Sequence, residues 1–325
     1  MRFVTQSELS ILTEEEFPTG IKRIEEQLSR RQHTGFFDSF DGQKLYYEYF
    51  LTENARGSVV IVHGLSEFTK KFYEISYYFL DRGFNVFLFD QRCHGLSCRL
   101  TDERDLLHVD KFEHYVADLS LFIDNIVLKT EEKPLYIYSH SMGGAVSALY
   151  LMQNSQKITK AVFSAPMFEP IVTVVPMPIA REGVRIGRLL CGSKAKFPMS
   201  KEFNPAIKRN PEVDQSPARF EHNMNLRRNQ PNYQSTPMSF GWTFEALAVK
   251  RKILKRKKVA GITTPILLLS AEKDQTVSNK AQALFADRCA ACEMVTVKNG
   301  THSMLCGNPD VLREHIGRTL AFFEN

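Results

Sequence analysis

The sequence predicts an α/β fold, a mostly parallel central sheet flanked by helices. Short apolar segments such as residues 58–62, 84–90 and 265–270 alternate with amphipathic segments, the pattern of buried parallel strands joined by helices. Asp41-Gly42 lies between two strand-like segments and predicts an antiparallel hairpin near the start. We therefore expect a mixed sheet that is covered on both faces.

The elements follow in order from these patterns. A polar helical lead-in comes first and is expected to break at Pro18-Thr19-Gly20. Residues 111–128 carry apolar side chains three and four apart, which predicts one helix with a buried face. The remaining expected strands are 35–40, 44–50, 135–138, 160–165 and 293–297, and the remaining expected helices are 71–82, 145–153, 279–288 and 309–323.

One long stretch, residues 166–245, departs from the alternation and holds ten of the fourteen prolines. A long interruption in an α/β chain is more typical of a functional lid than of a plain loop. We therefore divide the chain into an N-terminal extension (1–33), a core (34–165 and 246–325) and a cap insertion (166–245). The apolar beginning of the cap, 170–180, is expected either to pack onto the core or to line a binding pocket as well.

Composition excludes several classes. The sequence contains no run of about 18 apolar residues, the length that a membrane-spanning helix needs. The acidic N-terminus is not typical of a secretory signal. We therefore expect a cytoplasmic protein with reduced cysteines. Cys289 and Cys292 form a lone CxxC without a second pair, so no metal is expected. The basic run 250–258 is interpreted as a solvated helix face or as an attraction to an anionic membrane surface. It lacks the aromatic residues of a nucleic-acid site.

Ser141 lies between an apolar strand and a helix, in Ser139-His140-Ser141-Met142-Gly143. A serine pinched between strand and helix is the arrangement of a nucleophile elbow, whose tight turn needs small residues two positions before and after the serine. Gly143 meets that need. Ser139 stands where the G-x-S-x-G pattern has glycine, but it is also small.

A serine hydroxyl needs a base to take its proton and an acid to orient that base. Asp274 follows strand 265–270, and His302 follows strand 293–297, so both loops reach the edge of the sheet where Ser141 lies. The order Ser, Asp, His is that of the elbow architecture. We predict a triad of Ser141, Asp274 and His302, with Glu272 as the alternative acid.

Acyl transfer also needs two backbone N–H groups that stabilise the developing oxyanion. Met142, directly after the nucleophile, is the first candidate donor. Leu65 is the second, because His63-Gly64-Leu65 follows a buried strand and Gly64 lets the backbone turn there. His63 could be mistaken for the base, but its place before the glycine favours a structural hydrogen-bonding role.

The assembled residues resemble the monoacylglycerol lipase and lysophospholipase branch of the α/β-hydrolase superfamily, with spacing similar to that of bacterial lysophospholipases. The resemblance rests on HGLSE (63–67), DQRCHGLS (90–97), SHSMGG (139–144) and the loops of Asp274 and His302. It covers residues 35–325. Ser139, Cys93 and Ala271 replace family glycines with other small residues, which we interpret as drift.

This resemblance implies an α/β-hydrolase fold with a helical cap, no cofactor, and cleavage of carboxylic esters of lipid-like substrates through an acyl-enzyme. Gly64, Met167, Val175 and Met177 are the implied substrate-binding residues. Arg181, Arg185 and Arg188 share a helical face that is either solvated or meets a phosphate headgroup. Two alternatives stay open: a proline-type aminopeptidase on the same fold, and a binding protein that has lost the chemistry.

Overall fold

The computed structural model describes residues 11–131, 134–172 and 175–325. Within them one eight-stranded sheet has the order β1-β2-β4-β3-β5-β6-β7-β8. The strands are β1 Gln32–Asp38, β2 Lys44–Phe50, β3 Gly57–Val62, β4 Phe84–Phe89, β5 Leu135–His140, β6 Lys160–Ser164, β7 Ile266–Ala271 and β8 Cys292–Val297. β1 and β2 form the predicted antiparallel hairpin, β2 joins β4 antiparallel, and the other neighbours are parallel. The predicted mixed α/β sheet is confirmed.

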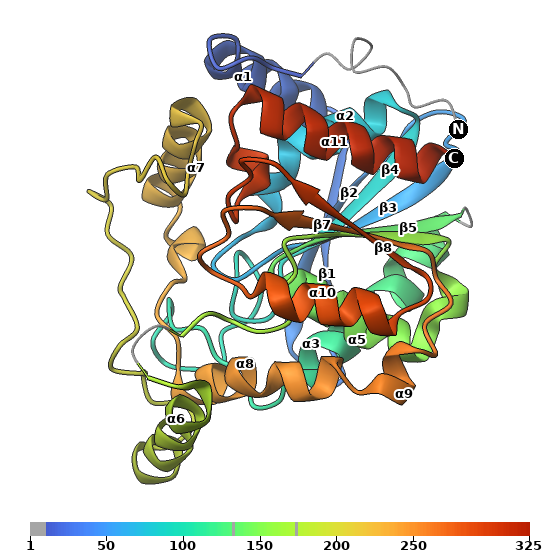
Figure 1. Ribbon diagram of the computed structural model, residues 1–325. Coiled ribbons are helices and arrows are strands. Elements are labelled where there is room, and N and C mark those ends of the chain that lie inside the picture. Colours follow the sequence, from blue (N-terminus) through green and yellow to red (C-terminus); the bar gives the residue numbers. More distant parts are fainter. Residues whose placement is uncertain (1–10, 132–133, 173–174) are drawn as a thin grey trace.

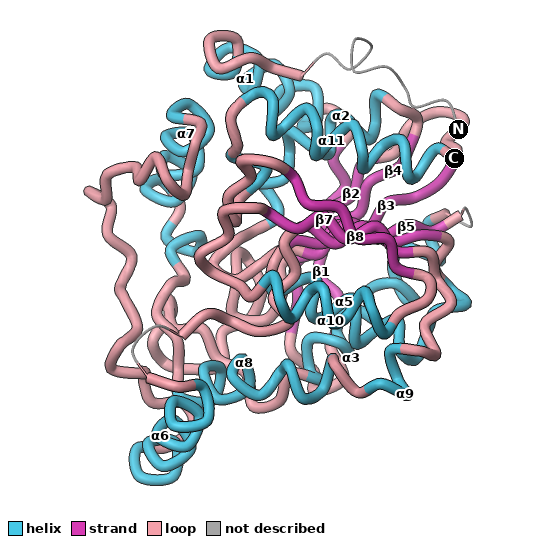
Figure 2. The backbone as a smooth tube through the Cα atoms, in the orientation of Figure 1, coloured by secondary structure: helices cyan, strands magenta, loops and turns pink. Residues whose placement is uncertain are grey.

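Helices cover both faces of this sheet (Figures 1 and 2). The α-helices of the described residues are α1 Phe17–Ser29, α2 Tyr73–Asp81, α3 Glu113–Phe122, α4 Leu128–Thr130, α5 Met142–Asn154, α6 Met177–Cys191, α7 Pro217–Asn229, α8 Phe240–Ile253, α9 Arg256–Val259, α10 Asn279–Arg288 and α11 Pro309–Glu324. Helices α1, α2 and α11 lie on one face, and α3, α5, α8 and α10 lie on the other. Among the described residues, no helix is long and apolar enough to cross a membrane.

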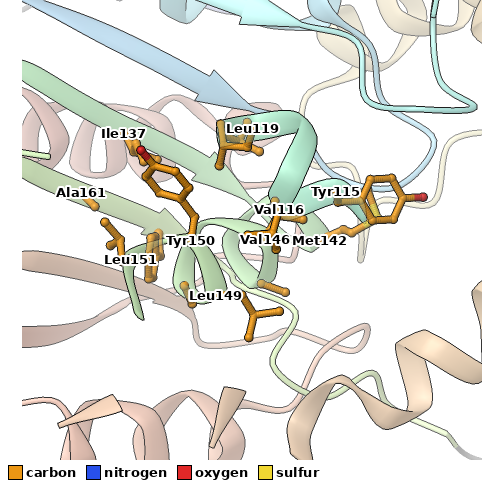
Figure 3. Close-up of a cluster of buried hydrophobic side chains, with 14 of the residues drawn as sticks. Tyr115, Val116, Leu119, Ile137, Met142, Val146, Leu149, Tyr150, Leu151 and Ala161 are labelled. Atoms are coloured by element: carbon orange, nitrogen blue, oxygen red, sulfur yellow. The ribbon is translucent and has the colours of Figure 1, made fainter. Parts of the chain in front are cut away.

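Two hydrophobic clusters result, because successive strand side chains point to opposite faces. In β3, Val59 and Ile61 belong to the cluster under α1, α2 and α11, whereas Val60 and Val62 belong to the other cluster. Figure 3 shows the second cluster where α3 meets α5, with Tyr115 beside Met142. The side chain of Met142 is fully buried there, so the residue after Ser141 is held in the core.

The expected break at Pro18-Thr19-Gly20 is wrong. α1 begins at Phe17 and runs through all three residues. Proline is tolerated in the first turn of a helix, where its missing N–H would have no intrahelical partner. A Cβ on Gly20 would lie 2.5 Å from Leu12 Cδ2, so glycine lets the preceding chain pack against the helix.

The helix expected over 111–128 is found, but it changes its pitch. α3 continues into a π-helical turn, Ile123–Val127, before α4. Phe122, Ile123 and Val127 are all fully buried, so the apolar face continues through the change.

The region 166–245 contributes no strand to the sheet within its described residues; it contains α6, α7, a short helix Pro231–Gln234 and the start of α8. Helix α8 is capped by Ser239 and runs without interruption past residue 245, where the sequence analysis placed the end of the cap. Its later residues Ala246, Val249 and Ile253 belong to the core cluster. One helix therefore joins the insertion to the core.

Candidate active site

Ser141 lies in a tight turn between β5 and α5. Its backbone adopts φ 51° and ψ −116°, in the left-handed region that residues other than glycine rarely occupy. The turn is held by the N–H of Ser141, which donates to the carbonyl of Ser164 at 3.0 Å. Such local strain at a strand-to-helix serine is typical of a nucleophile elbow.

Small residues around the elbow are required by close packing. A Cβ on Gly143 would lie 2.0 Å from the carbonyl oxygen of Val62 on the neighbouring strand. A Cβ on Gly144 would lie 2.6 Å from Pro166 Cβ. Ser139, which replaces the usual glycine, is fully buried without disrupting the turn, and the strand β5 extends beyond it to His140.

The structure brings Ser141, His302 and Asp274 into one hydrogen-bonded chain. His302 Nε2 lies 2.9 Å from Ser141 Oγ, and His302 Nδ1 lies 2.8 Å from Asp274 Oδ2. The serine hydroxyl can donate to Nε2 while Nδ1–H donates to the carboxylate, the arrangement in which the imidazole is ready to accept the serine proton. The three residues meet because the parallel strands β5, β7 and β8 end at the same edge of the sheet.

The electrostatics favour a neutral base and an ionised acid. Burial lowers the pKa of His302, and the nearby His140 lowers it further, while the hydrogen bond to Asp274 acts in the opposite direction. Burial would raise the pKa of Asp274, but the contact with His302 and the N–H groups of Val277 and Thr276 hold it below its ordinary value. Asp274 can therefore stay ionised to orient a neutral imidazole.

Glu272, the alternative acid, lies elsewhere. Its Oε2 accepts a hydrogen bond from the Asn299 N–H at 2.8 Å, which fastens the loop before His302. It makes no hydrogen bond to the imidazole of His302 among the described residues, where Asp274 occupies that position.

The two candidate oxyanion donors lie on either side of the nucleophile. In the described part of the chain, the N–H groups of Leu65 and Met142 donate no hydrogen bond to another protein group. A Cβ on Gly64 would lie 3.1 Å from Ser141 Cβ, so this glycine brings the loop after β3 against the nucleophile. Unpaired N–H groups beside a serine are what stabilisation of an oxyanion requires.

His63 has a structural environment, as its position before the glycine indicates. Its Nε2 accepts a hydrogen bond from the Gln91 N–H at 2.9 Å, and its Nδ1 donates to the carbonyl of Gly64 at 2.7 Å. The ring is buried, and burial lowers its pKa. It therefore joins the loop after β3 to the loop after β4.

The candidate substrate-binding residues occupy different environments. Met167 is buried, and its N–H donates to the carbonyl of Ser141 at 2.8 Å. Val175 is 39% exposed, and Met177 begins helix α6. Within the described residues of 170–180, Ile171 and Ile179 are 41% and 61% exposed, and both alternatives for this segment stay predictions.

Two of the three residues that replace family glycines fit without difficulty, and one is strained. Ser139 and Ala271 are fully buried and have no left-handed backbone. Cys93 is also fully buried but has φ 63°, a conformation that glycine adopts more easily.

A hydrogen-bonded network of Glu67, His140 and Lys71, for which the sequence predicts no role, lies beside the triad. Glu67 Oε2 accepts from the Gly64 N–H at 2.5 Å and contacts His140 Nδ1 at 2.9 Å, and Glu67 Oε1 accepts from Lys71 Nζ at 2.5 Å. His140 Nε2 lies 3.1 Å from the carbonyl oxygen of His302. Glu67 and His140 stand inside the HGLSE and SHSMGG segments, so their position in these motifs was the available signal.

Comparison with known proteins covers most of the chain. Residues 53–310 match the family described as serine aminopeptidase, S33. A probable lysophospholipase L2 from Haemophilus influenzae is 28% identical over 306 residues, which span 89% of this chain and 94% of the relative. Lysophospholipase L2 from Escherichia coli K12 is 26% identical over 296 residues, 87% of this chain and 81% of that relative.

Solved structures show the same architecture. A soluble variant of monoglyceride lipase from Saccharomyces cerevisiae superposes with a TM-score of 0.74 at 18% identity, covering 90% of this chain and 95% of that one. A thermostable carboxyl esterase from Bacillus coagulans gives 0.72 at 13% identity, covering 91% and 98%. These similarities confirm the predicted α/β-hydrolase fold.

Proposed function

Because this chain belongs to the serine aminopeptidase S33 family of α/β-hydrolases, we propose that it is a serine hydrolase that cleaves carboxylic esters of lipid-like substrates, a lysophospholipid or a monoacylglycerol. The observation that carries the proposal is the hydrogen-bonded chain from Ser141 through His302 to Asp274. The relatives matched over most of their length carry lysophospholipase names, which supports a lipid ester as the substrate.

The proposed mechanism follows from the geometry. Ser141 Oγ attacks the ester carbonyl while His302 Nε2 takes its proton, and the N–H groups of Leu65 and Met142 stabilise the tetrahedral oxyanion. His302 then returns the proton to the leaving alcohol, and the acyl group stays on Ser141. Water activated by His302 hydrolyses this acyl-enzyme, which releases the fatty acid and restores the serine.

An aminopeptidase reaction is less well supported. It would need free acidic groups near the site to bind a substrate's amino terminus, but most carboxylates of the cap are engaged by basic residues. The ion pairs are Glu169–Lys250, Glu182–Arg185, Glu202–Lys196 and Glu221–Arg228. A monoacylglycerol carries no amino group and needs no free carboxylate.

A direct test compares substrates and a nucleophile variant. The wild-type protein should hydrolyse lysophospholipids or monoacylglycerols, show no turnover of proline naphthylamide, and be labelled by a fluorophosphonate. Ser141→Ala should abolish both turnover and labelling while leaving the melting temperature close to that of the wild type. Labelling that persists in this variant, or preferred turnover of the amide, would contradict the proposal.

Peripheral contact with an anionic membrane surface forms the second part of the proposal. Ile179, Ile186 and Leu190 lie on one side of α6, at spacings of seven and four residues, and are 61%, 47% and 81% exposed. α6 packs against α8, and Figure 1 shows α6, α8 and α9 along the lower edge of the molecule. The basic run at the end of α8 and in α9 is mostly exposed; its exposed members are Arg251, Lys255, Arg256, Lys257 and Lys258.

The apolar side chains of α6 lie near the start of α8, where Arg188 meets Phe244, and the exposed cations follow the other end of α8. Apolar groups and cations along one edge match a surface of anionic lipid headgroups over acyl chains. The arginines of α6 contribute little free positive charge to this surface. Arg185 pairs with Glu182, and the guanidinium of Arg188 lies 5.2 Å from the centre of the Phe244 ring. Of the two alternatives for these arginines, contact with a substrate's phosphate headgroup is therefore not proposed, and the basic run alone supplies the cations of the proposed membrane contact.

Vesicle sedimentation tests this contact. The protein should bind phosphatidylglycerol vesicles more strongly than phosphatidylcholine vesicles, and Ile186→Glu with Leu190→Glu should remove most of the binding. The same variant should hydrolyse a soluble p-nitrophenyl ester at the wild-type rate, because neither residue contacts the triad. Equal binding to both vesicle types, or unchanged binding by the variant, would refute membrane contact through this surface.

A further inference from the structure

We propose that Glu67 and His140 are positioning residues that fasten both the oxyanion loop (63–67) and the base loop (298–303) to the nucleophile elbow. This inference rests on the proposed triad. His140 directly precedes the nucleophile, and Glu67 ends the loop that carries Leu65. Neither residue takes part in a chemical step. Each acts by holding in place the residues that do.

The base loop is held at His302 through both the side chain and the backbone carbonyl of this residue. His302 lies in a loop, where no helix or strand hydrogen bonds fix its backbone. Its imidazole bonds to Ser141 Oγ at 2.9 Å, and its carbonyl oxygen contacts His140 Nε2 at 3.1 Å. Two consecutive residues of the elbow therefore set the position and the orientation of the base.

The oxyanion loop is held by the same network. Glu67 Oε2 accepts from the Gly64 N–H at 2.5 Å, in the residue before Leu65, and it also meets His140 Nδ1. A Cβ on Gly64 would lie 3.2 Å from that Nδ1 and 3.1 Å from Ser141 Cβ, so the loop and the elbow are in close contact. Glu67 Oε2 thus joins the loop that carries Leu65, the predicted oxyanion donor, to the elbow.

The hydrogen bonds determine the charges. His140 Nε2 faces a carbonyl oxygen and Nδ1 faces a carboxylate, and both of these groups only accept. An imidazole donates to both acceptors only when each nitrogen carries a proton, so these two contacts match the doubly protonated ring. Burial would raise the pKa of Glu67, but His140 and Lys71 hold it well below its ordinary value, so this carboxylate stays ionised.

Other titratable groups surround this network. Lys71 bonds to Glu67 Oε1 and also faces Asp214 and Cys306, and His315 lies within electrostatic range of His140. The ring centroids of His140 and His302 are 5.1 Å apart. A cation at that distance disfavours protonation of His302, in addition to the effect of its burial.

A matched pair of substitutions separates position from charge. Both His140→Asn and His140→Gln remove the positive charge. The longer glutamine amide can still reach the His302 carbonyl from the Nε2 position, whereas the asparagine amide corresponds to Nδ1 and can reach only Glu67. Glu67→Gln removes the carboxylate that accepts from the Gly64 N–H and contacts His140 Nδ1.

The pH profile of kcat/KM on a soluble p-nitrophenyl ester gives the readout. Without the cation, protonation of His302 becomes easier and its pKa rises. His302 must be neutral to accept the serine proton. When its pKa rises, activity therefore begins to fall at a higher pH as the solution is made more acidic. We expect the acid limb to move upward by about one pH unit in His140→Asn and His140→Gln. Glu67→Gln removes an anion that raises the pKa of His302, so no upward movement is expected in that variant. We also expect kcat to fall by roughly tenfold or more in His140→Asn, with little change in KM and a smaller loss in His140→Gln.

Folded His140 variants that keep the wild-type acid limb and kcat would overturn the inference. Should the variants fail to fold, nitrogen chemical shifts of the histidine rings in the wild-type protein decide instead. Both ring nitrogens of His140 should carry protons at pH 7, and a single protonated nitrogen would overturn the inference. Turnover by Ser141→Ala would refute the proposed triad, whereas an unchanged acid limb beside an inactive Ser141→Ala refutes only the positioning role.

Discussion

The loops that follow β3, β5, β7 and β8, here called the catalytic rim, differ from helix α6 in how far their side chains are exposed to solvent. At the rim the Asp274 side chain is fully buried and that of His302 is 12% exposed. In α6, Leu189 and Leu190 are 71% and 81% exposed. The rim fixes polar groups by burial and hydrogen bonds, whereas α6 presents apolar groups that touch little of the protein. Chemistry that needs sub-ångström geometry requires the first arrangement, and the second is what the proposed contact with a membrane surface would use.

Glycines show the same contrast. Gly143, at the rim, has no room for a Cβ, which would lie 2.0 Å from a backbone oxygen. Gly183, in the middle of α6, has no atom within 4 Å of the position of a Cβ. The first glycine is required by packing, and the second is not.

The largest effect should come from the acid of the rim. We expect Asp274→Asn to lower kcat by about 10⁴-fold, because an amide no longer holds His302 in the tautomer that accepts the serine proton. Steady-state hydrolysis of the preferred ester measures it. Glu272→Gln is the matched control, since Glu272 bonds only to the Asn299 N–H in the described residues. Similar losses in the two variants would contradict the assignment of Asp274.

Gly143→Ala should have the next largest effect. Its Cβ must displace the backbone of β3 at Val62, which moves the oxyanion loop away from Ser141. We expect a loss of about 10²-fold in kcat, as displacements of about 1 Å produce, together with a lower melting temperature. A variant with unchanged activity would show that the rim tolerates a shift of the elbow, and the contrast with α6 would fail.

The pH profile of the wild-type protein gives a more moderate effect. The pKa of His302 is lowered by burial and by His140, so His302 stays neutral below the ordinary histidine value. Activity should rise with pH through this lowered pKa, and the acid limb should have its midpoint below about 6.5. The profile of kcat/KM on a soluble ester measures the midpoint. A value at or above 6.5 would show that the rim does not bias its base toward the neutral form.

The smallest effect should come from Gly183→Ala in α6. The added Cβ meets nothing within 4 Å, and alanine favours a helix over glycine. We expect a gain of up to about 1 kcal/mol in stability, measured as a slightly higher midpoint of denaturant unfolding, with unchanged hydrolysis of a soluble ester. Destabilisation would indicate that α6 packs more tightly than the structure shows.

Much of this protein follows from local sequence pattern. Strand-like apolar runs and helical periodicity located the sheet and its covering helices, and the order of Ser141, Asp274 and His302 along the chain placed each at the end of a strand. Two interpretations do not match the structure. Pro18 is predicted to break a helix, but it stands in the first turn, where a helix tolerates proline. The cap is predicted to end at residue 245, which lies inside the continuous helix α8, whose later residues belong to the core cluster.

The sequence by itself determined the alternation of strands and helices and the residues that can perform the chemistry, because side-chain periodicity and turn chemistry act over a few residues. Only the tertiary structure decided which of those residues meet. Ser141 and His302 are 161 positions apart, Glu67 and His140 are 73 apart, and the outward side of α6 depends on what α8 already covers. Such contacts form when the sheet brings the ends of separate strands to one edge, and no local pattern encodes that distance.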